Sequence, residues 1–193
     1  QAIGRGCVYP PNVTTVVNQL SGAGLSWKGY MEDMGNDPAR EARTCGRSPL
    51  GTKDATGYAT RGDEYASKHD PFVYFRSIHD HPAYCSAHVV NLDQLTLDLK
   101  HIHTTPNFAY ITPGLCHDGH DEPCVDGKPG GLISINRFLE TWVPRITHSP
   151  AFRRNGMLVV LFDESEAWPA EEVLDVGHRP GRQVVQGHHL VTA

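Results

Sequence analysis

The chain has 193 residues, enough for one hydrophobic core or for one large part of a bigger domain. Hydrophobic residues make up 39% and charged residues 20%, a balance that predicts a folded protein and excludes a disordered one. The net charge of −5, without a basic stripe, argues against a nucleic-acid partner, and the lack of a run of about 20 apolar residues argues against a stable membrane anchor.

The first half of the chain predicts a helix followed by short strands. Asn12 can cap a first helix, which Gly22 and Gly24 end. The apolar residues of this helix recur at helical spacing: Val13, Val16, Val17 and Leu20. "LSWKGYME" reads as a strand, a polar loop covers about residues 35–67, and "PFVYF" predicts a short apolar strand.

The second half continues the alternation of helix and strand. A helix is predicted from the spacing of Leu92, Leu95, Leu99 and Ile102, and "NFAYIT" predicts a strand that ends at Pro113. A long helix follows over 131–146, and Pro144 should kink or shorten it near its end. "MLVVLF" reads as the clearest buried strand. The pattern predicts an α/β fold with a mostly parallel sheet and helices on its faces.

The last residues differ from the rest. Residues 168–193 show no clean period, so we expect an irregular tail with a weak strand at "QVVQ". Residues 1–167 would then form part of one domain. Among the cysteines, the odd count of five leaves one thiol over, and their scattered positions favour an oxidising, extracytoplasmic compartment.

Acidic residues follow two of the predicted strands. In parallel sheets, ligands bind beyond the carboxyl ends of the strands. Asp163 and Glu164 come directly after "MLVVLF", and their carboxylate oxygens suit a hard divalent cation. The alternative interpretation is a solvated turn, because strands often end in acidic residues.

The other acidic cluster also contains histidines. After "NFAYIT" come His117, Asp118, His120 and Asp121, and an imidazole there can bind a metal or protonate a leaving group. Cys116 and Cys124 could close this loop as a disulfide or, at a spacing that matches no standard structural site, belong to a zinc knuckle. His69 precedes Pro71 and lies in a predicted turn, where a plain surface residue is the default. No motif of a nucleophilic serine or of a phosphate-binding glycine loop is present.

Four ordered segments carry a family resemblance. "GLSWKGYMEDM", "KHDPFVYF", "FAYITPGLCHDGHD" and "FLETWVPRITHSPAFRRNGMLVVLFDE" together resemble the phosphoesterase family, which includes acid phosphatases and bacterial phospholipases C and belongs to the alkaline phosphatase-like superfamily. The resemblance implies a three-layer α/β/α fold and metal-assisted hydrolysis of a phosphate ester. Metal identity stays open: oxygen ligands favour calcium, magnesium or manganese, and histidines would allow zinc or iron.

The resemblance also implies roles for individual residues. By motif, Asp163 and Glu164 bind the metal, and Asp118 and Asp121 contact metal or phosphate. The same motifs place His120, His69 and His117 at the active site as the acid–base or phosphate-binding groups.

The family pattern is incomplete in this sequence. The strand with an acidic-plus-amide metal pair and the Ser or Thr nucleophile of the family have no counterpart here, and the glycine-rich segment expected after "FDESEA" is missing. We therefore expect the central and C-terminal part of a phosphoesterase domain, incomplete at the N-terminus. Two alternatives are a non-catalytic fragment or metal-binding module, and a different hydrolase of the superfamily such as a sulfatase.

Overall fold

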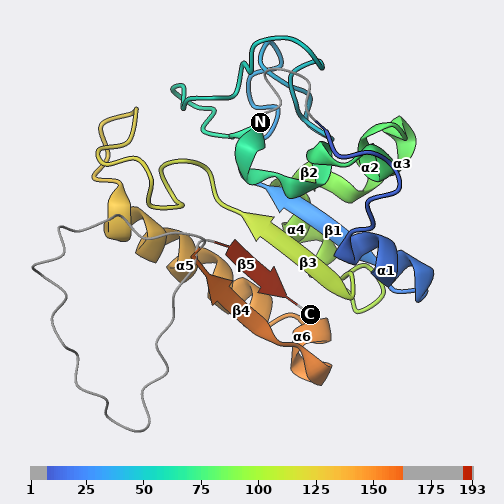
Figure 1. The fold of residues 1–193 in the computed structure, drawn as a ribbon. Coiled ribbons are helices and arrows are strands. Elements are labelled where there is room, and N and C mark those ends of the chain that lie inside the picture. The colour runs from blue at the N-terminus through green and yellow to red at the C-terminus, as the bar shows by residue number, and fades with distance from the viewer. Residues whose placement is uncertain (1–7, 163–188, 193) are drawn as a thin grey trace, which may run out of the picture.

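A computed structural model describes residues 8–162 and 189–192 of the chain. Its centre is a five-stranded sheet in the order β2-β1-β3-β5-β4 (Figure 1). The strands are β1 (Trp27–Met31), β2 (Val89–Asn91), β3 (Phe108–Thr112), β4 (Leu158–Leu161) and β5 (His189–Thr192). β1 pairs in parallel with β2 and β3, whereas β5 is antiparallel to both β3 and β4. The mostly parallel sheet confirms the predicted α/β class, and the alkaline phosphatase-like assignment stays a prediction.

Short helices surround this sheet. They are α1 (Val16–Gly22), α2 (Arg76–His79), α3 (Pro82–His88), α4 (Asp93–Asp98), α5 (Gly131–Thr147), α6 (Pro150–Asn155) and the 3₁₀ helices η2 (Ser67–His69) and η3 (Pro71–Tyr74). Within the described ranges, none of these helices combines the length and the apolar character needed to cross a bilayer.

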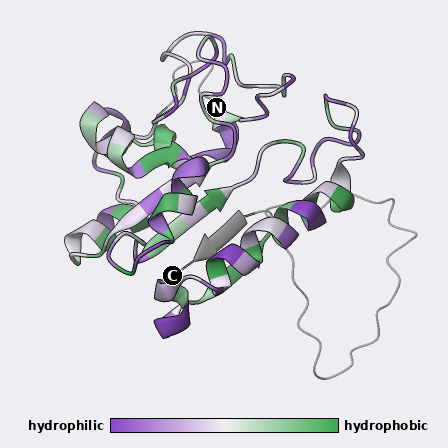
Figure 2. Ribbon diagram, turned by 180° about the vertical axis from the view of Figure 1, so that it is seen from behind, coloured by the Kyte–Doolittle hydropathy of each residue, from purple (hydrophilic) through white to green (hydrophobic). Residues whose placement is uncertain are grey.

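The two faces of the sheet bury separate hydrophobic clusters, because successive side chains of a strand point to opposite faces. Tyr30 of β1 joins a cluster with residues of α4 and α5, whereas Trp27 and Met31 join a cluster with residues of α1, α3 and η3. Figure 2 shows hydrophilic residues in the loops and also on the helices, where they alternate with hydrophobic ones. Helices therefore cover both faces, and the polar loops at the strand ends are left to form a site.

Two predictions for the first half were wrong. "PFVYF" forms η3 and not a strand, because Pro71 sits at its first turn and the Asp70 side chain accepts a hydrogen bond from the Phe72 backbone N–H at 3.0 Å. The cap of α1 is Thr15 and not Asn12. Thr15 forms a capping box with Asn18, and this shifts the start of the helix towards its last apolar positions.

The second half forms the predicted helices and strands but differs from the predictions in detail. α4 ends at Asp98, before Ile102, because the hydroxyls of Thr104 and Thr105 donate to the Asp98 carbonyl. α5 continues through Pro144 to Thr147. β4 is present but only partly buried, so "MLVVLF" is not the clearest buried strand.

The described part of the predicted tail is β5. Residues 189–192 form this strand, and the weak strand expected at "QVVQ" lies outside the described residues.

Candidate active site

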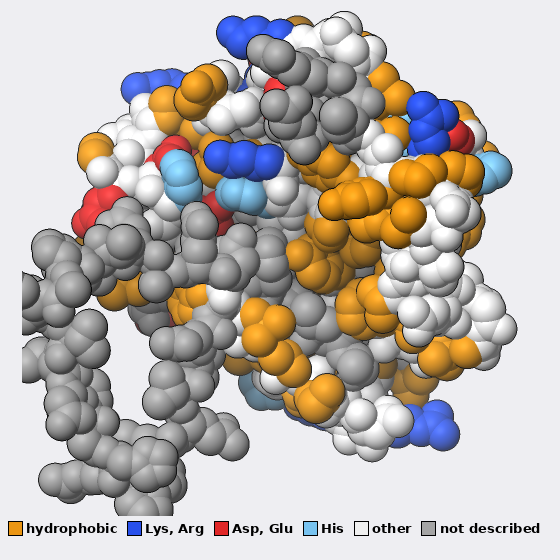
Figure 3. All heavy atoms as spheres, in the orientation of Figure 1, with side chains coloured by type: hydrophobic (Ala, Val, Ile, Leu, Met, Phe, Trp, Pro, Cys, Tyr) orange, Lys and Arg blue, Asp and Glu red, His pale blue; other side chains and the backbone are white. Residues whose placement is uncertain are grey.

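Polar side chains gather beyond the carboxyl ends of β1 and β3. These strands run in parallel, with Met31 opposite Thr112, and the Glu32 backbone N–H continues the ladder by donating to the Thr112 carbonyl at 3.0 Å. The residue after β1 and the loop after β3 therefore leave the sheet at the same edge. Figure 3 shows histidine side chains beside acidic and basic side chains on this face of the molecule.

Glu32 and His117 form the best-defined pair of this site. His117 Nδ1 lies 3.0 Å from both carboxylate oxygens of Glu32, and Glu32 Oε2 also accepts from the Gly114 backbone N–H at 2.8 Å. The hydrogen bond to Glu32 raises the pKa of His117, against an opposing contribution from burial. Because Nδ1 is used by Glu32, Nε2 is the ring nitrogen left for a ligand.

Glu64 fixes the start of the loop that carries His117. Its carbonyl accepts from the Leu115 N–H at 2.9 Å, and its carboxylate accepts from the Cys116 N–H at 3.1 Å. Asp33, the neighbour of Glu32, accepts in turn from the Glu64 N–H at 3.2 Å. Burial raises the pKa of Glu64 and raises that of Asp33 to about 6. Two segments distant in sequence are thus tied to one loop.

A disulfide closes the same loop. Cys116 and Cys124 are bonded, with their Cα atoms 5.1 Å apart, and a second disulfide joins Cys45 to Cys85. The sequence left the Cys116–Cys124 disulfide and a zinc knuckle open, and the structure has the disulfide. Sulfurs that are bonded to each other are not the thiolates that zinc requires, so the zinc knuckle is excluded.

His69 and Asp118 form a second pair of imidazole and carboxylate. His69 ends η2, and its Nδ1 lies 3.2 Å from Asp118 Oδ2. Asp118 is buried, and its Oδ1 accepts from the His120 backbone N–H at 2.8 Å. Oδ2 has no well-aligned hydrogen bond within the described residues, and its contact with His69 is an ion pair when the imidazole is protonated. The Thr112 hydroxyl, at the end of β3, donates to the His69 carbonyl at 3.3 Å.

The remaining predicted residues lie at the rim or outside the described ranges. His120 Nδ1 contacts the neighbouring Asp121 Oδ1 at 2.8 Å, and the His120 side chain is 54% exposed. Asp163 and Glu164 lie outside the described residues. The structure therefore brings His69, His117 and Asp118 to one edge of the sheet, with His120 and Asp121 at the margin of the same loop.

Sequence reasoning missed Glu32 and Glu64. Glu32 is the last residue of the predicted strand "LSWKGYME" and directly follows β1, so the rule that placed ligands beyond strand ends could have indicated it. Glu64 lies in a long polar loop without periodicity, and nothing in its local sequence distinguishes it from other acidic residues.

A metal ion is not accommodated by the described residues alone. In the ranges 8–162 and 189–192, no three His, Cys, Asp or Glu side chains converge as a metal site requires. Within these ranges, no third side chain joins the predicted ligands Asp118 and Asp121 to complete a metal site.

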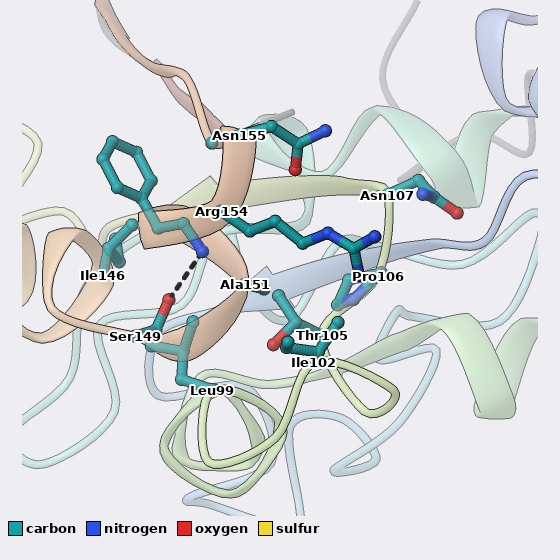
Figure 4. A pocket seen from close by; sticks show the side chains of 12 residues that line it. Leu99, Ile102, Thr105, Pro106, Asn107, Ile146, Ser149, Ala151, Arg154 and Asn155 are labelled. Atoms are coloured by element: carbon teal, nitrogen blue, oxygen red, sulfur yellow. Dashed lines mark hydrogen bonds between the residues drawn. The ribbon is translucent and has the colours of Figure 1, made fainter.

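A pocket lies at the opposite edge of the sheet. It is lined by apolar residues of α5 and α6, by Leu99 and Ile102, which follow α4, and by Asn107, which precedes β3; Figure 4 shows Arg154 extending across it. The five residues of β3 separate this pocket from the His117 loop by about 16 Å. It is thus distinct from the candidate active site.

The fold and the site already define a class of protein without reference to known relatives. They describe an α/β protein with imidazole–carboxylate pairs beyond the carboxyl ends of parallel strands, where enzymes of this architecture bind their ligands. The chain belongs to the phosphoesterase family, whose model matches residues 5–192. Members of this family are generally metal-dependent.

Curated relatives agree with this family. The chain is 24% identical over 160 residues to the "Phosphate-repressible acid phosphatase" of Penicillium chrysogenum, covering 82% of this chain and 33% of that protein. It is 22% identical over 159 residues to the "Probable acid phosphatase" of Kluyveromyces lactis, with the same coverage of 82% and 33%. The chain thus spans about a third of the length of these relatives. No solved structure matches it significantly.

Proposed function

We propose that the chain carries part of the active site of a phosphoric ester hydrolase of the acid phosphatase type. The observation that carries the proposal is the pairing of His117 with Glu32 and of His69 with Asp118 at one edge of the sheet. Hydrolysis of a phosphate ester needs groups that neutralise phosphoryl charge and protonate the leaving oxygen, and imidazoles can do both. Membership of the phosphoesterase family and the names of the fungal relatives support this reaction class.

His117 is suited to hold a proton at mildly acidic pH. Glu32 stabilises its charged form, and Nε2 is left to face a substrate. His69, next to the buried Asp118, is placed to neutralise a phosphoryl oxygen with its other ring nitrogen. His120 stays in the proposal as a group at the rim that contacts the substrate.

We further propose that Asp163 and Glu164, with Asp118 and Asp121, hold a divalent cation. A cation bound there would polarise the phosphoryl oxygens and lower the pKa of an attacking hydroxyl. β4 supports this placement, because its pairing through β5 orients it parallel to β3 and its carboxyl end lies at the same edge. The two strands are separated by β5, which corresponds to about 10 Å between β3 and β4.

The test is to assay an aryl phosphate and a phosphatidylcholine, each with and without a chelator. These assays check the reaction class, the substrate class and the need for a metal together. We expect turnover of the aryl phosphate, loss of it with chelator, and recovery when a divalent cation is restored. Turnover of phosphatidylcholine would instead favour the phospholipase C type. Chelator-insensitive turnover would reject the metal, and inhibition by sulfate but not by phosphate would favour a sulfatase.

A second candidate is a non-catalytic fragment or metal-binding module. The observation that favours it is the length of the relatives, of which this chain covers about a third. Absence of turnover with both substrates, together with a metal titration that still shows binding, would support this alternative. We place either form in an extracytoplasmic compartment, which the two disulfides support.

A further inference from the structure

Asn12 begins the sequence Asn12-Val13-Thr14, the acceptor pattern for N-linked glycosylation. None of the other asparagines of the chain is followed by Ser or Thr two positions later. A pattern of three residues is short, so the structural setting of Asn12 has to decide whether a sugar can be attached there.

The setting of Asn12 is an exposed turn. The Val13 N–H donates to the Pro10 carbonyl at 3.0 Å and closes the turn, and Asn12 and Thr14 are both exposed. The helix that follows is capped by Thr15, so it makes no use of the Asn12 side chain. In the part of the chain that the structure describes, neither the Asn12 amide nor the Thr14 hydroxyl has a hydrogen-bond partner. Both groups are therefore available to a modifying enzyme.

The turn is attached to the folded body without being part of its core. Tyr9, just before it, pairs with η3 and the segment that follows: its N–H donates to the Tyr74 carbonyl at 2.7 Å, and its own carbonyl accepts from the Arg76 N–H at 3.0 Å. The Tyr9 ring also stacks on Phe75, with 5.0 Å between ring centroids. No residue from 10 to 14 is buried. A bulky group on Asn12 would therefore displace no core side chain.

The disulfides are compatible with the compartment in which N-linked sugars are transferred. Cys45–Cys85 and Cys116–Cys124 require an oxidising environment such as the lumen of the endoplasmic reticulum. The fungal origin of the matched relatives is compatible with passage through that lumen. The acceptor pattern and its exposure are two observations that single out Asn12, and the disulfides agree with a compartment in which it could be modified.

We propose that Asn12 is an N-glycosylation site. In the reaction, Asn12 Nδ2 forms a bond to the anomeric carbon of an oligosaccharide carried by a lipid diphosphate. The bond between that carbon and the phosphate oxygen breaks, the lipid diphosphate leaves with the electron pair, and one amide proton is released. The Thr14 hydroxyl is the recognition element two positions downstream.

The test is to secrete the full chain from a eukaryotic host and to compare its electrophoretic mobility before and after an enzyme that removes N-glycans. We expect a shift, and peptide mapping should find Asn12 converted to aspartate by the enzyme. Asn12→Gln and Thr14→Ala should abolish the shift, whereas Thr14→Ser, which keeps a hydroxyl, should retain it. Asn155→Gln is the matched control, because Asn155 is exposed but outside any acceptor pattern.

An unmodified Asn12 in the secreted, disulfide-bonded chain would overturn the proposal. The peptide map of the unaltered chain gives this answer even where a variant fails to be secreted. Because the readout is the attached sugar, the result is independent of whether the chain hydrolyses phosphate esters.

Discussion

Glu32 is placed to do two things with one carboxylate. It orients His117 through Nδ1, and it holds the turn before that histidine through the Gly114 N–H. Both contacts leave the carboxylate only partly exposed, which strengthens its effect on the imidazole. The same contact therefore fixes the position of the imidazole and favours its protonated form.

Removing His117 should affect the chemical step if the proposed reaction is correct. In a form of the enzyme with measurable turnover, we expect His117→Ala to lower kcat by about 10²–10⁴-fold, the usual range for a group that transfers a proton. Glu32→Gln keeps an acceptor for Gly114 but loses the charge, so we expect a smaller loss of kcat. Steady-state kinetics with an aryl phosphate measure both effects.

Substitutions of two other histidines serve as controls for His117→Ala. His101→Ala changes a histidine that stacks on His103 in the loop before β3, and we expect no change in kcat. His120→Ala should act mainly on KM, since the side chain is exposed and contacts only its neighbour Asp121 within the described residues. Unchanged kcat in His117→Ala would show that this histidine does not transfer the proton.

The motifs predicted part of this site from sequence alone. His69, His117 and Asp118 stand in recognisable segments, and the structure brings them to one edge of the sheet. The contacts of Glu32 with His117 and of Glu64 with Cys116 join residues 85 and 52 positions apart. Local pattern carries no information on such pairs, because only the parallel pairing of β1 with β3 and the loop contacts bring them together.

The loop from Cys116 to Cys124 is held from several sides. The disulfide closes it, Glu64 binds its start, and the Gly131 N–H at the beginning of α5 donates to the Asp121 carbonyl at 3.2 Å. Loops that carry functional residues depend on such a rigid support.

Removal of one disulfide should mainly affect the stability of the chain, and removal of the other should mainly affect its activity. Chain entropy assigns about 2.5 kcal/mol to the Cys116–Cys124 bond, with a sequence separation of 8, and about 4 kcal/mol to Cys45–Cys85, with a separation of 40. Paired Cys→Ser variants should therefore lose more stability at Cys45–Cys85 in urea unfolding. We expect the larger loss of activity at Cys116–Cys124, because that bond supports the loop with His117. The opposite order of activities would argue against this loop as the active site.

Gly130 is a second support of the loop. Its φ is +72°, and a Cβ atom there would lie 1.9 Å from the Asp121 carbonyl oxygen, so an alanine meets both backbone strain and a collision. We expect Gly130→Ala to lower the unfolding free energy by more than the roughly 1–2 kcal/mol of a left-handed backbone alone.

Gly127→Ala is the matched control for this substitution. Gly127 has a φ of +88° but nothing within 4 Å of a Cβ atom, so only the backbone term applies. Equal losses in chemical unfolding would show that the contact with Asp121 is not what requires glycine at position 130.

Helices and strands differ in how well the sequence predicted them. "NFAYIT" became β3 because its apolar residues alternate between two buried faces. "PFVYF" has a similar composition, yet the capping of Phe72 by Asp70 and the position of Pro71 turned it into η3. Hydrophobic composition is thus not sufficient where a capping residue and a proline precede the apolar run.

Across the molecule, buried carboxyl groups set the dependence of stability on pH. Burial raises the pKa of Asp33 to about 6 and those of Glu41 and Asp70 to about 7. Asp70 is fully buried, and its Oδ2 lies 3.2 Å from the Tyr65 hydroxyl, which also donates to the Gly46 carbonyl at 2.6 Å. A protonated Asp70 can donate its own hydrogen to the Tyr65 oxygen, so that both contacts are satisfied.

The folded chain should therefore be more stable at pH 4.5 than at pH 7.5. Between the unfolded pKa values near 4 and the folded values near 6–7, the folded state binds more protons, so the unfolding free energy falls as pH rises through this window. For Asp70 alone the loss is on the order of 4 kcal/mol. His79, whose pKa is lowered by burial, acts in the opposite direction below its unfolded pKa.

Thermal unfolding across this pH range measures the effect. Asp70→Asn keeps a neutral side chain that can accept from the Phe72 N–H and donate to Tyr65, so we expect a flatter pH profile than in the unaltered chain. A Tm that rises steadily from pH 4.5 to 7.5 would contradict the assignment of these carboxyl groups.

β5 lies between β3 and β4 although it follows both in the chain. During synthesis, β1, β2 and β3 can assemble as soon as they emerge, but β4 must wait for a later segment before its edge is hydrogen-bonded. Until then β4 exposes an unpaired backbone, the kind of surface on which chains associate with one another. The order of the strands thus makes the arrival of β5 the step at which β4 gains its hydrogen-bonded neighbour.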